Sequence, residues 1–445
     1  MDAGTLREGE GRSFVGGMHI PEYKSLTNDV PIRRMAIPDR VIVPLMQHSG
    51  APCEPLVQVG ATVQLGQKIG DSEEFISAPV HATLSGTVVA IERRTHPAGE
   101  AVECVVIEGK GEQGEFVPVA KNNPDQMSPE ELKDAIKEAG LVGMGGAAFP
   151  TYVNINTRQP VDTLILNGAE CEPFLTCDHR LMVERADELI TGADILMRCI
   201  GAKKTFIGIE SNKLDAIRIL SSKTKAREDM EVVPLAVKYP QGYKSYLIKT
   251  ITGRDVPRGA RSAALGCIVR NVGTTFAVYE AVVHGKPFIE RIITVSGPEV
   301  PNRGNYIVRL GTPADFILRE AGVDPNQLAG NKVIFGGPMT GLAQSDLNVP
   351  VVKNTTGVLV LPSELVREQV PYTACVRCGV CVERCPNWLY PHQLSILSEY
   401  GMYEEMQQWD IWDCIECGVC AYVCPSQRPI VHFVKRAKTV IDNMS

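Results

Sequence analysis

The sequence lacks any apolar run that approaches the roughly 20 residues required for a membrane-spanning helix. It also lacks a basic excess, since the formal net charge is −7, and we therefore expect no nucleic-acid partner. We expect no signal peptide at its start. Together these absences predict a cytoplasmic protein, or a peripheral subunit on the cytoplasmic side of a larger assembly.

A disulfide framework is missing as well. Six of the 14 cysteines are scattered without a pairing pattern, which is typical of a reducing compartment. These six are Cys53, Cys104, Cys171, Cys177, Cys199 and Cys267. The others are concentrated between residues 375 and 425, where the run C-x2-C-x2-C-x3-C-P occurs twice.

The two cysteine runs are typical of bacterial ferredoxins with two [4Fe–4S] clusters, in which the fourth cysteine of each run ligates the other cluster. A structural zinc site would use two C-x2-C pairs, which leaves the third and fourth cysteines of each run unexplained. The clusters would carry electrons one at a time. The predicted ligand sets are Cys375, Cys378, Cys381 and Cys424 for one cluster, and Cys414, Cys417, Cys420 and Cys385 for the other.

Glycine and proline accompany each cysteine run. We expect Gly379 and Gly418 to let the backbone pass close to a cluster. We expect the fourth cysteine of each run to open the next helix, with Pro386 or Pro425 in its first turn.

Short β runs bounded by Gly, Pro or Asp occupy residues 40–119 and predict a compact all-β module. The phrases VQVGATVQLGQKIG and APVHATLSGTVVAIE resemble the barrel-sandwich fold of lipoyl and biotinyl carriers. The matching turn at residues 72–75 has no lysine to modify, so we expect a scaffold rather than a swinging arm. His48 and His81 could be ligands, but lone histidines in a β module are more often packed and hydrogen-bonded.

A glycine-rich loop follows a predicted helix. Ser128 and Glu131 form a capping box, and apolar residues at 132, 136 and 139 share one helix face. The next segment, GLVGMGGAAFPT (140–151), exposes backbone N–H groups with little obstruction, which suits phosphate binding. It follows a helix rather than a strand and lacks a Gly-Lys-Ser/Thr sequence, so it is neither a Rossmann fingerprint nor a Walker A loop. Taken alone, it could also be a plain tight turn.

Apolar strands then alternate with helices, which predicts an α/β sheet whose ligands lie outside the carboxyl ends of the strands. The strands are expected at 161–173 and 204–211, and the helices at 179–199 and 213–222. Polar residues at the strand ends are Asn167, Glu170, Glu172 and Glu210. Two later polar clusters, at 239–242 and 270–274, also lie at element boundaries, where a cofactor could bind.

These stretches resemble the C subunit of the Rnf complex (RnfC, called RsxC in some bacteria), from about Phe14 to about Lys438. The middle part is similar to the flavin subunit of respiratory complex I, which holds FMN non-covalently and accepts hydride from NADH. The phrases that carry the resemblance include GGMHIPE, PLMQHSGAP, SAPVHATLSGTV, GMGGAAFPT, LILNGAECEPFLTCDHRLM, YPQG, TGRDVP, NVGT, FGGPMTG and CIECGVCAYVCPSQRP.

The resemblance implies a multidomain chain of α/β and α+β class. Its expected parts are an N-terminal extension (1–37), a barrel-sandwich domain (38–124), an α/β FMN- and NAD(H)-binding domain (125–288), a soluble-ligand-binding β-grasp domain (289–365) and a two-cluster ferredoxin-like helical domain with a C-terminal tail (366–445). It also implies FMN bound by Gly143, Gly145, Gly146, Asn167, Glu170, Tyr239, Gly242, Asn271 and Thr274, with Phe149 near the nicotinamide side. No side chain is poised as an acid or base, and we name no catalytic residue.

Several positions depart from the complex I pattern. Asn154 stands in place of the lysine after the flavin loop, Ala148 in place of a loop glycine, and Ala169 in place of an acidic residue. The Gly-Glu-Glu of complex I falls on residues 242–244. Lys244 could contact a phosphate, although a lysine at such a position is more often simply exposed on a helix. Main-chain N–H groups carry much of FMN binding, so these departures bear mainly on NAD(H).

The resemblance implies an oxidoreductase subunit in which NAD(H) exchanges a hydride with FMN and two clusters carry single electrons. In the Rnf complex, this flow links NADH and ferredoxin, through membrane subunits, to Na⁺ or H⁺ translocation. The implied partners are the other Rnf subunits, especially the iron–sulfur B subunit, with ferredoxin reached indirectly. One alternative is an electron-relay and docking module without its own NADH site. Another is a flavin and iron–sulfur cobalamin reductase, although there the flavin domain comes first.

The C-terminal tail predicts an amphipathic helix. Its apolar residues could pack on the ferredoxin-like domain, and they are Val431, Val434 and Val440, with Phe433. Lys435, Arg436 and Lys438 could meet an acidic partner or lipid headgroups, or could form a solvated helix face.

Overall fold

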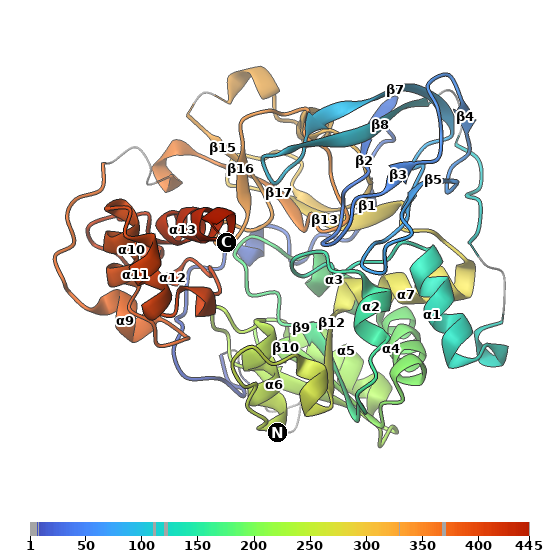
Figure 1. The fold of residues 1–445 in the computed structure, drawn as a ribbon. Helices are drawn as coiled ribbons and strands as arrows, with labels where there is room; N and C mark the ends of the chain where they lie inside the picture. Colours follow the sequence, from blue (N-terminus) through green and yellow to red (C-terminus); the bar gives the residue numbers. More distant parts are fainter. Residues whose placement is uncertain are drawn as a thin grey trace.

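The computed structural model describes residues 7, 9–109, 113–119, 123–328, 330–366 and 371–444. The predicted extension at 1–37 and the predicted ferredoxin-like region at 366–445 each include residues outside this set. Figure 1 shows a helical region at one side, formed by the C-terminal residues, against a larger body that contains all the sheets. Among the described residues, no helix combines the length and hydropathy needed to cross a bilayer.

Two small antiparallel sheets form the first domain and share one core, in which Val41 and Val43 pack with Ile69 and Val80. The alternation of buried and exposed residues along the strands produces this core. One sheet contains, in spatial order, β2 (Arg40–Pro44), β8 (Ala101–Gly109), β7 (Gly86–Thr95) and β4 (Thr62–Val63). The other contains β3 (Glu54–Pro55), β5 (Lys68–Asp71) and β6 (Val80–His81). This arrangement confirms the predicted barrel-sandwich fold.

The second domain is a parallel four-stranded sheet covered on both faces. Leu164 and Leu166 pack on one face and Ile165 on the other, as expected of a doubly buried strand. The strands, in spatial order, are β11 (Met230–Leu235), β10 (Lys204–Glu210), β9 (Thr163–Gly168) and β12 (Cys267–Asn271). The helices are α1 (Pro129–Glu138), α2 (Thr151–Ile155), α3 (Cys177–Glu184), α4 (Ala186–Ile200), α5 (Leu214–Thr224), α6 (Lys244–Thr252) and α7 (Val272–His284).

Local sequence explains several of these helix boundaries. The capping box at the start of α1 is confirmed, because Ser128 Oγ accepts from the N–H of Glu131 while the Glu131 carboxylate accepts from the N–H of Ser128. The single helix predicted at 179–199 is instead two helices, α3 and α4. They separate at Arg185, whose φ of −130° and ψ of 37° lie outside the helical region.

A six-stranded sheet and helix α8 (Ala314–Glu320) form the third domain. Its buried residues join the same core cluster as one face of the parallel sheet, so the two domains are packed directly together. The strands, in spatial order, are β1 (Arg33–Arg34), β14 (Gly304–Arg309), β13 (Glu290–Ser296), β17 (Gly357–Leu361), β15 (Lys332–Phe335) and β16 (Leu342–Gln344).

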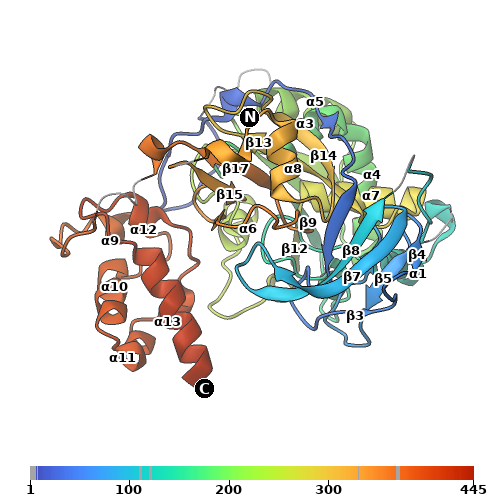
Figure 2. The same ribbon diagram turned by 90° about the horizontal axis from the view of Figure 1, so that it is seen from above.

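The C-terminal domain is helical and stands apart from the sheets in Figure 2. Val434 and Ile441 of the last helix pack on Leu394 and Leu397, which confirms that this helix buries an apolar face. Lys438 differs from the expectation of a partner-facing or solvated lysine. Its Nζ donates to the carbonyl of Cys414 over 2.7 Å. The helices are α9 (Val380–Arg384), α10 (Pro391–Glu399), α11 (Tyr403–Gln408), α12 (Val419–Tyr422) and α13 (Ile430–Met444).

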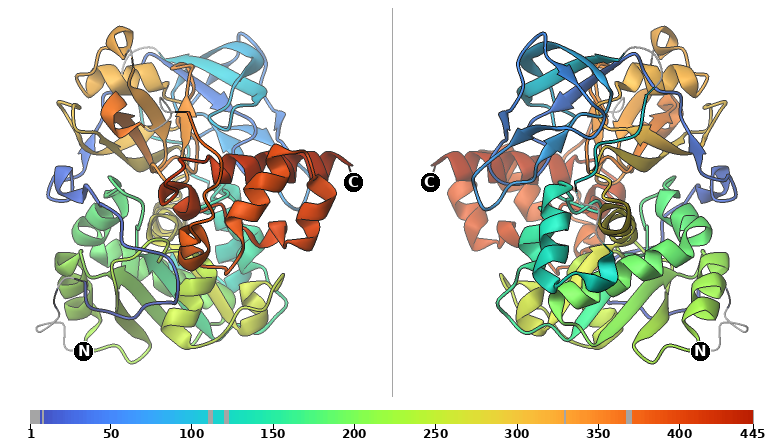
Figure 3. Two further views of the ribbon diagram at one scale, coloured as in Figure 1. Left: turned by 90° about the vertical axis from the view of Figure 1, so that its left-hand side faces the viewer. Right: turned by 90° about the vertical axis from the view of Figure 1, so that its right-hand side faces the viewer.

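The chain before β2 connects three of these domains, and Figure 3 shows it running along the outside of the body. Arg12 forms a bridge with Leu235 of β11. The N–H of Gly17 donates to the carbonyl of Arg384 over 3.2 Å, in the cysteine-rich domain. β1 then pairs in parallel with β14. The described part of the predicted extension therefore contributes to the packing between domains.

Candidate cofactor-binding sites

The glycine-rich loop is closed at its base and held against helix α7. The N–H of Gly143 donates to the carbonyl of Phe149 over 2.9 Å, so the loop returns on itself. The N–H of Met144 donates to Thr274 Oγ1 over 3.0 Å. At Gly145, a Cβ atom would lie 3.2 Å from Cβ of Asn271, which is too close for a larger residue without adjustment. At Gly146 nothing lies within 4 Å of such an atom. The loop thus presents exposed, unobstructed backbone.

Two asparagines at the carboxyl ends of neighbouring strands connect this loop to the next turn. Asn167 of β9 is paired in register with Asn271 of β12. The Nδ2 of Asn167 donates to the carbonyl of Gly242 over 2.8 Å. The Oδ1 of Asn271 accepts from the N–H groups of Gly273 and Thr274 and so caps helix α7. The structure therefore brings the predicted loop, strand and turn residues to one edge of the parallel sheet.

The Glu170 carboxylate is engaged within the protein. Its two oxygens accept from the N–H groups of Asp178, over 2.7 Å, and His179, over 3.2 Å, at the start of α3. Glu170 itself has a φ of 47°. Asp178 in turn accepts from Asn271 Nδ2 over 2.6 Å. Burial, and then the charge of Glu170, raise the pKa of Asp178. Asp178 was not among the predicted site residues, because it follows the strand by a full loop and only the fold brings it back.

Two buried lysines hold the loop after β9 in place. Nζ of Lys24 donates to three carbonyls of residues 170–175, at 2.7 to 2.9 Å. Nζ of Lys213 donates to the carbonyl of Ala169 over 2.7 Å and pairs with Glu210 at 3.3 Å. These cations satisfy carbonyl groups that would otherwise be buried without donors. The polar strand-end residue Glu210 therefore has a structural partner.

Tyr239 is oriented differently from the expected flavin contact. Only 3% of its surface is exposed, and its ring packs with Ile20 and Val419. Its hydroxyl donates to the carbonyl of Cys417 over 2.7 Å. The side chain thus faces the cysteine-rich domain, while the turn that follows it is bonded through Gly242 to Asn167 of β9.

Phe149 and Lys244 lie at the periphery of the same region. Phe149 is half-buried, and Lys244 is exposed as the first residue of α6. Ala148, which stands in place of a glycine, has a φ of 51°, a left-handed conformation that glycine adopts more readily.

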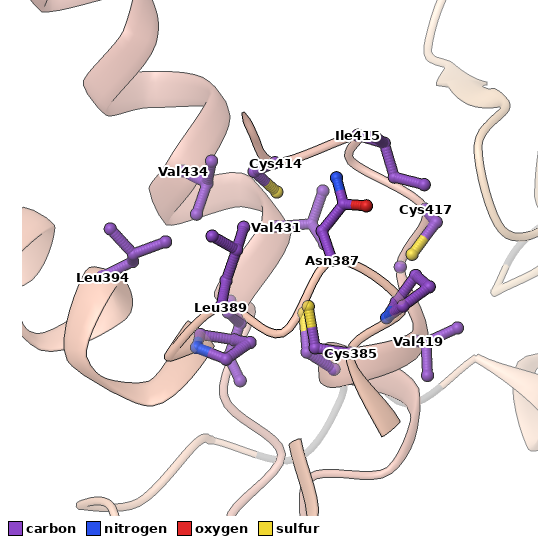
Figure 4. A pocket seen from close by; sticks show the side chains of 15 residues that line it. Cys385, Asn387, Leu389, Leu394, Cys414, Ile415, Cys417, Val419, Val431 and Val434 are labelled. Carbon is purple, nitrogen blue, oxygen red and sulfur yellow. The ribbon is translucent and has the colours of Figure 1, made fainter. Parts of the chain in front are cut away.

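The cysteines converge in the two predicted sets. One cavity is lined by Cys385, Cys414, Cys417 and Cys420 and is called here the inner cavity. In Figure 4 the sulfur atoms of Cys385, Cys414 and Cys417 point toward one another from different segments. A second cavity, called here the outer cavity, is lined by Cys375, Cys378, Cys381 and Cys424.

The electrostatics of the thiols fit two cationic cores. Burial is the main cause that raises the pKa of Cys381, followed by the charges of Cys375, Cys378 and Cys424. Burial likewise raises the pKa of Cys420, followed by the charges of the other inner-cavity cysteines. Four neighbouring thiolates would repel one another, so they require bound metal to stay deprotonated. The cysteines therefore fit iron–sulfur clusters.

The glycine and proline of each run play roles set by the backbone. Gly379 and Gly418 have φ values of 80° and 83° and precede α9 and α12, a conformation that glycine adopts without strain. The expected place of the prolines was wrong. Pro386 and Pro425 lie in turns after α9 and α12 and do not open the next helices, which begin several residues later. Proline disfavours helical geometry in the residue before it, so each fourth cysteine lies beyond the end of a short helix.

The inner cavity adjoins the domain of the parallel sheet through several contacts. Besides the bond from Tyr239, the hydroxyl of Tyr246 donates to Asn387 Oδ1. The carbonyl of Met339 would lie 3.0 Å from a Cβ atom at Gly418. The N–H of Met339 donates to the Glu172 carboxylate over 3.0 Å, which links this contact to the loop after β9. The inner cavity is therefore the one next to the parallel sheet.

Two buried polar side chains near the flavin edge of the sheet have atoms without a hydrogen-bond partner among the described residues. Gln241 is fully buried, and neither its amide oxygen nor its nitrogen has a partner among the described residues. Arg270 is 8% exposed, and its Nε and Nη2 lack partners in the same set. Buried polar groups are normally paired, so both point to a polar ligand. The open glycine loop and these donors fit a flavin mononucleotide.

Comparison with known protein families matches three parts of the chain. Residues 12–112 match the RnfC barrel sandwich hybrid domain, residues 136–280 match the Nuo51 FMN-binding domain, and residues 368–425 match a 4Fe-4S dicluster domain. The chain therefore contains an FMN-binding domain and a domain for two [4Fe–4S] clusters.

Curated relatives match nearly the whole chain. The C subunit of the proton-translocating ferredoxin:NAD(+) oxidoreductase complex of Clostridium ljungdahlii is 41% identical over 96% of this chain and 94% of its own length. The C subunit of the Na(+)-translocating ferredoxin:NAD(+) oxidoreductase complex of Acetobacterium woodii is 40% identical over 96% of this chain and 97% of its own length. The C subunit of the ion-translocating oxidoreductase complex of Serratia proteamaculans is 41% identical, over 96% of this chain and 61% of its own length.

Among solved structures, the NAD⁺-reducing [NiFe]-hydrogenase shares the fold. In the air-oxidized state it aligns with a TM-score of 0.50 and 20% identity, over 66% of this chain and 60% of that one. In the H2-reduced state the TM-score is 0.51, over 71% and 62%.

Proposed function

Because the chain belongs to the family of C subunits of ion-translocating ferredoxin:NAD(+) oxidoreductase complexes, we propose that it conducts electrons between a nicotinamide dinucleotide and the rest of such a complex. FMN bound by this chain would supply hydride exchange with NAD(H) and single-electron exchange with two [4Fe–4S] clusters. In the whole complex this flow would be coupled to Na⁺ or H⁺ translocation. Ferredoxin and the iron–sulfur B subunit are the proposed partners, with the chain bound peripherally on the cytoplasmic side.

The residues of the chain would hold and orient the flavin. The backbone of the glycine loop at 143–146 offers N–H groups, and Asn167 and Asn271 fix the loop and the turn at Gly242 at the sheet edge. Thr274 and Glu170 hold the surrounding backbone. None of these side chains is required as an acid or base, since the cofactor supplies the chemistry.

The order of the two cysteine sets is the observation that carries this proposal. The bond from the Tyr239 hydroxyl to the Cys417 carbonyl, 2.7 Å long, joins the flavin turn to the inner set. The outer set includes Cys378, which is exposed at the surface. We infer that the inner cysteines would hold the cluster that receives electrons from the flavin, and that the outer cysteines would hold the cluster that passes them on at the surface near Cys378.

The test is to purify the full chain anaerobically, determine its iron and flavin, and record its visible spectrum before and after NADH. The proposal expects about eight irons per chain, as two cubane clusters require, FMN that is released by acid, and bleaching of both chromophores. Flavin that dithionite reduces and NADH does not would refute NADH as the donor and favour the electron-relay alternative. Zinc in place of iron would refute the assignment of the cysteines.

A further inference from the structure

The glycine-rich loop is held by residues from two other domains. Ser49, from the barrel-sandwich domain, donates through Oγ to the carbonyl of Ala147 and through its N–H to the carbonyl of Ala148, the latter over 3.3 Å. Asn354, from the domain of the six-stranded sheet, donates through Nδ2 to the carbonyl of Gly146 over 3.2 Å. Three consecutive loop carbonyls therefore have their donors outside the domain that contains the loop.

These bonds fix the direction of the loop's N–H groups. In a planar trans peptide, the C=O of one residue and the N–H of the next point in opposite directions. Because the carbonyls of residues 146–148 point toward Ser49 and Asn354, the N–H groups of residues 147–149 point away from them. None of these three N–H groups donates to a residue that the structure describes. They are therefore free donors on the opposite side of the loop.

The turn that carries Ser49 is itself fixed. His48 is 5% exposed, and its Nε2 donates to the carbonyl of Ala51 over 2.8 Å. The N–H of Ala51 donates to the carbonyl of Ile76 over 2.9 Å, and a Cβ atom at Gly50 would lie 2.1 Å from the same oxygen. These contacts leave the turn little freedom, so Ser49 is presented to the loop in one orientation.

The segment that carries Asn354 is anchored at the same place. Lys353 is 1% exposed, and its Nζ donates to the carbonyl of Gly140 over 2.8 Å and to that of Pro79 over 2.6 Å. Its N–H donates to Gln47 Oε1 over 3.2 Å. Gly140 begins the glycine-rich segment, whereas Pro79 and Gln47 belong to the barrel-sandwich domain. Three domains therefore meet beside the loop, and its conformation depends on their packing.

We propose that Ser49 and Asn354 are positioning residues for the flavin. They hold the loop carbonyls outward, so that the N–H groups of residues 147–149 face the bound cofactor. The proposal deepens the function proposed above and rests on it, because it requires FMN at this loop. Oriented backbone N–H groups stabilise negative charge that develops on a ligand. The two residues therefore also favour the reduced flavin, and each acts through the loop backbone.

The test uses two variants of the full chain, Ser49→Ala and Asn354→Ala, each with a matched control. Ser85→Ala removes a serine of the barrel-sandwich domain whose Oγ accepts from a backbone N–H over 2.9 Å. Asn348→Ala removes an asparagine that bonds to a neighbouring aspartate over 3.0 Å, in the same domain as Asn354. After flavin removal, with the iron retained, binding of FMN would be measured by fluorescence quenching.

The expected losses follow from the bonds removed. We expect Ser49→Ala to weaken FMN binding about 3- to 10-fold, as the loss of one hydrogen bond predicts. Asn354→Ala should weaken it about 2- to 3-fold, because its bond is longer and exposed. Both controls should bind FMN as the wild type does.

Two further measurements separate positioning from a merely structural role. Ser49→Thr keeps the hydroxyl and should restore most of the affinity. The midpoint potential of the bound flavin should be lower in Ser49→Ala than in the wild type, because N–H groups that turn away no longer stabilise the reduced form. A merely structural role would leave this potential unchanged.

Wild-type affinity in both variants, in chains that retain iron, would overturn the proposal, and so would an equal loss in the controls or an unchanged flavin potential. If Ser49→Ala does not fold, Asn354→Ala decides, because it lies in a different domain and should shift the affinity and the potential in the same directions. A wild-type chain that binds FMN, but whose flavin NADH leaves oxidised, would instead refute the proposed function. The positioning role would then stand, since affinity and potential are measured without NADH.

Discussion

At the residue scale, Tyr239 shows how one side chain can connect two cofactor sites. The family resemblance assigns it to FMN, but its hydroxyl donates to the carbonyl of Cys417 in the inner cavity. The turn that follows it, ending at Gly242, accepts a hydrogen bond from Asn167 at the flavin edge. The residue therefore fixes the flavin edge and the inner cysteine loop relative to each other.

Replacing Tyr239 by phenylalanine should separate flavin reduction from onward transfer. We expect Tyr239→Phe to lower the stability by about 1–3 kcal/mol, because the buried carbonyl of Cys417 loses its donor. NADH should still bleach the flavin at the wild-type rate, while cluster bleaching becomes slower. Stopped-flow spectra at flavin and cluster wavelengths would show both rates. Tyr152→Phe on α2 is the matched control, and equal cluster rates in the two variants would contradict this role.

Ala148 offers a second test at this scale. Its φ of 51° is a left-handed conformation that costs a residue with a Cβ atom about 1–2 kcal/mol. Glycine relieves this cost but loses about 0.5–1 kcal/mol of chain entropy. We therefore expect Ala148→Gly to stabilise the flavin-loaded chain by up to about 1.5 kcal/mol. The temperature of flavin release on heating measures this, and a lower temperature would contradict it.

At the scale of elements, the short helices α9 and α12 have the same design but different surroundings. Each begins after a glycine with a positive φ, at Gly379 and Gly418. A Cβ atom at Gly379 would meet no protein atom within 4 Å, whereas at Gly418 it would lie 3.0 Å from the carbonyl of Met339. The start of α12 is thus packed against the rest of the molecule, whereas the start of α9 is open at Gly379.

This difference predicts unequal effects of the same substitution. Gly379→Ala should cost about 1–2 kcal/mol for the backbone conformation alone. Gly418→Ala should cost more, because Met339 must also move. We expect Gly418→Ala to lose iron from the inner set, and Gly379→Ala to lose less, when both are purified side by side. Iron content and electron paramagnetic resonance of the reduced proteins would distinguish them, and a greater loss from Gly379→Ala would contradict the packing argument.

Two buried histidines of the barrel-sandwich domain should make the stability of the folded chain depend on pH. Burial, with the charge of Lys353 as the next cause, lowers the pKa of His81 to about 3 and that of His48 to about 4. Between these values and about 6.5, the unfolded chain binds protons that the folded chain does not, so stability falls as the pH falls. A pKa that differs by one pH unit between the folded and unfolded chains corresponds to about 1.4 kcal/mol of stability.

A His81→Leu variant tests this dependence. Leucine is neutral at every pH, so the difference in unfolding temperature between wild type and variant should shift in favour of the variant as the pH is lowered from about 6.5 to about 4. Thermal unfolding followed by circular dichroism across this range is the measurement. A difference that does not vary with pH would show that His81 is not the group responsible.

At the scale of the whole molecule, the packing of the domains places the inner cysteines next to the domain that contains the flavin edge. The ion pairs of Arg258 with Asp410 and Asp413 add a polar contact between the flavin domain and the helical domain. These pairs are exposed and contribute little energy. The buried contact of Tyr239 with Cys417 is therefore the stronger link between the two domains.

This arrangement predicts opposite consequences for cysteines in the two sets. Cys378→Ser in the outer set should leave NADH able to bleach the flavin and the inner set, with about four irons retained, while reduction of an external one-electron acceptor is lost. Cys417→Ser in the inner set should stop electrons at the flavin. Resonance spectra after NADH addition would show which set is reduced. A reduced outer set in Cys417→Ser would overturn the proposed order.

Local sequence determined those features that depend on short spacing. The cysteine spacing predicted both ligand sets, including the exchange of Cys385 and Cys424, and the structure brings together the same groups. The capping box at Ser128 and the buried face of α13 also followed from near neighbours. In each case the interacting residues lie within one turn or one motif, where the covalent geometry limits the arrangements available.

Tertiary structure decided the features that join distant segments. The hydroxyl of Tyr239 meets a carbonyl 178 residues away, and Lys24 caps a loop about 150 residues further along the chain. Asp178 and Arg270, whose Nε and Nη2 have no partner among the described residues, likewise acquire their surroundings only when the sheet edge is assembled. No periodicity or motif encodes such contacts, because each depends on how whole domains pack against one another.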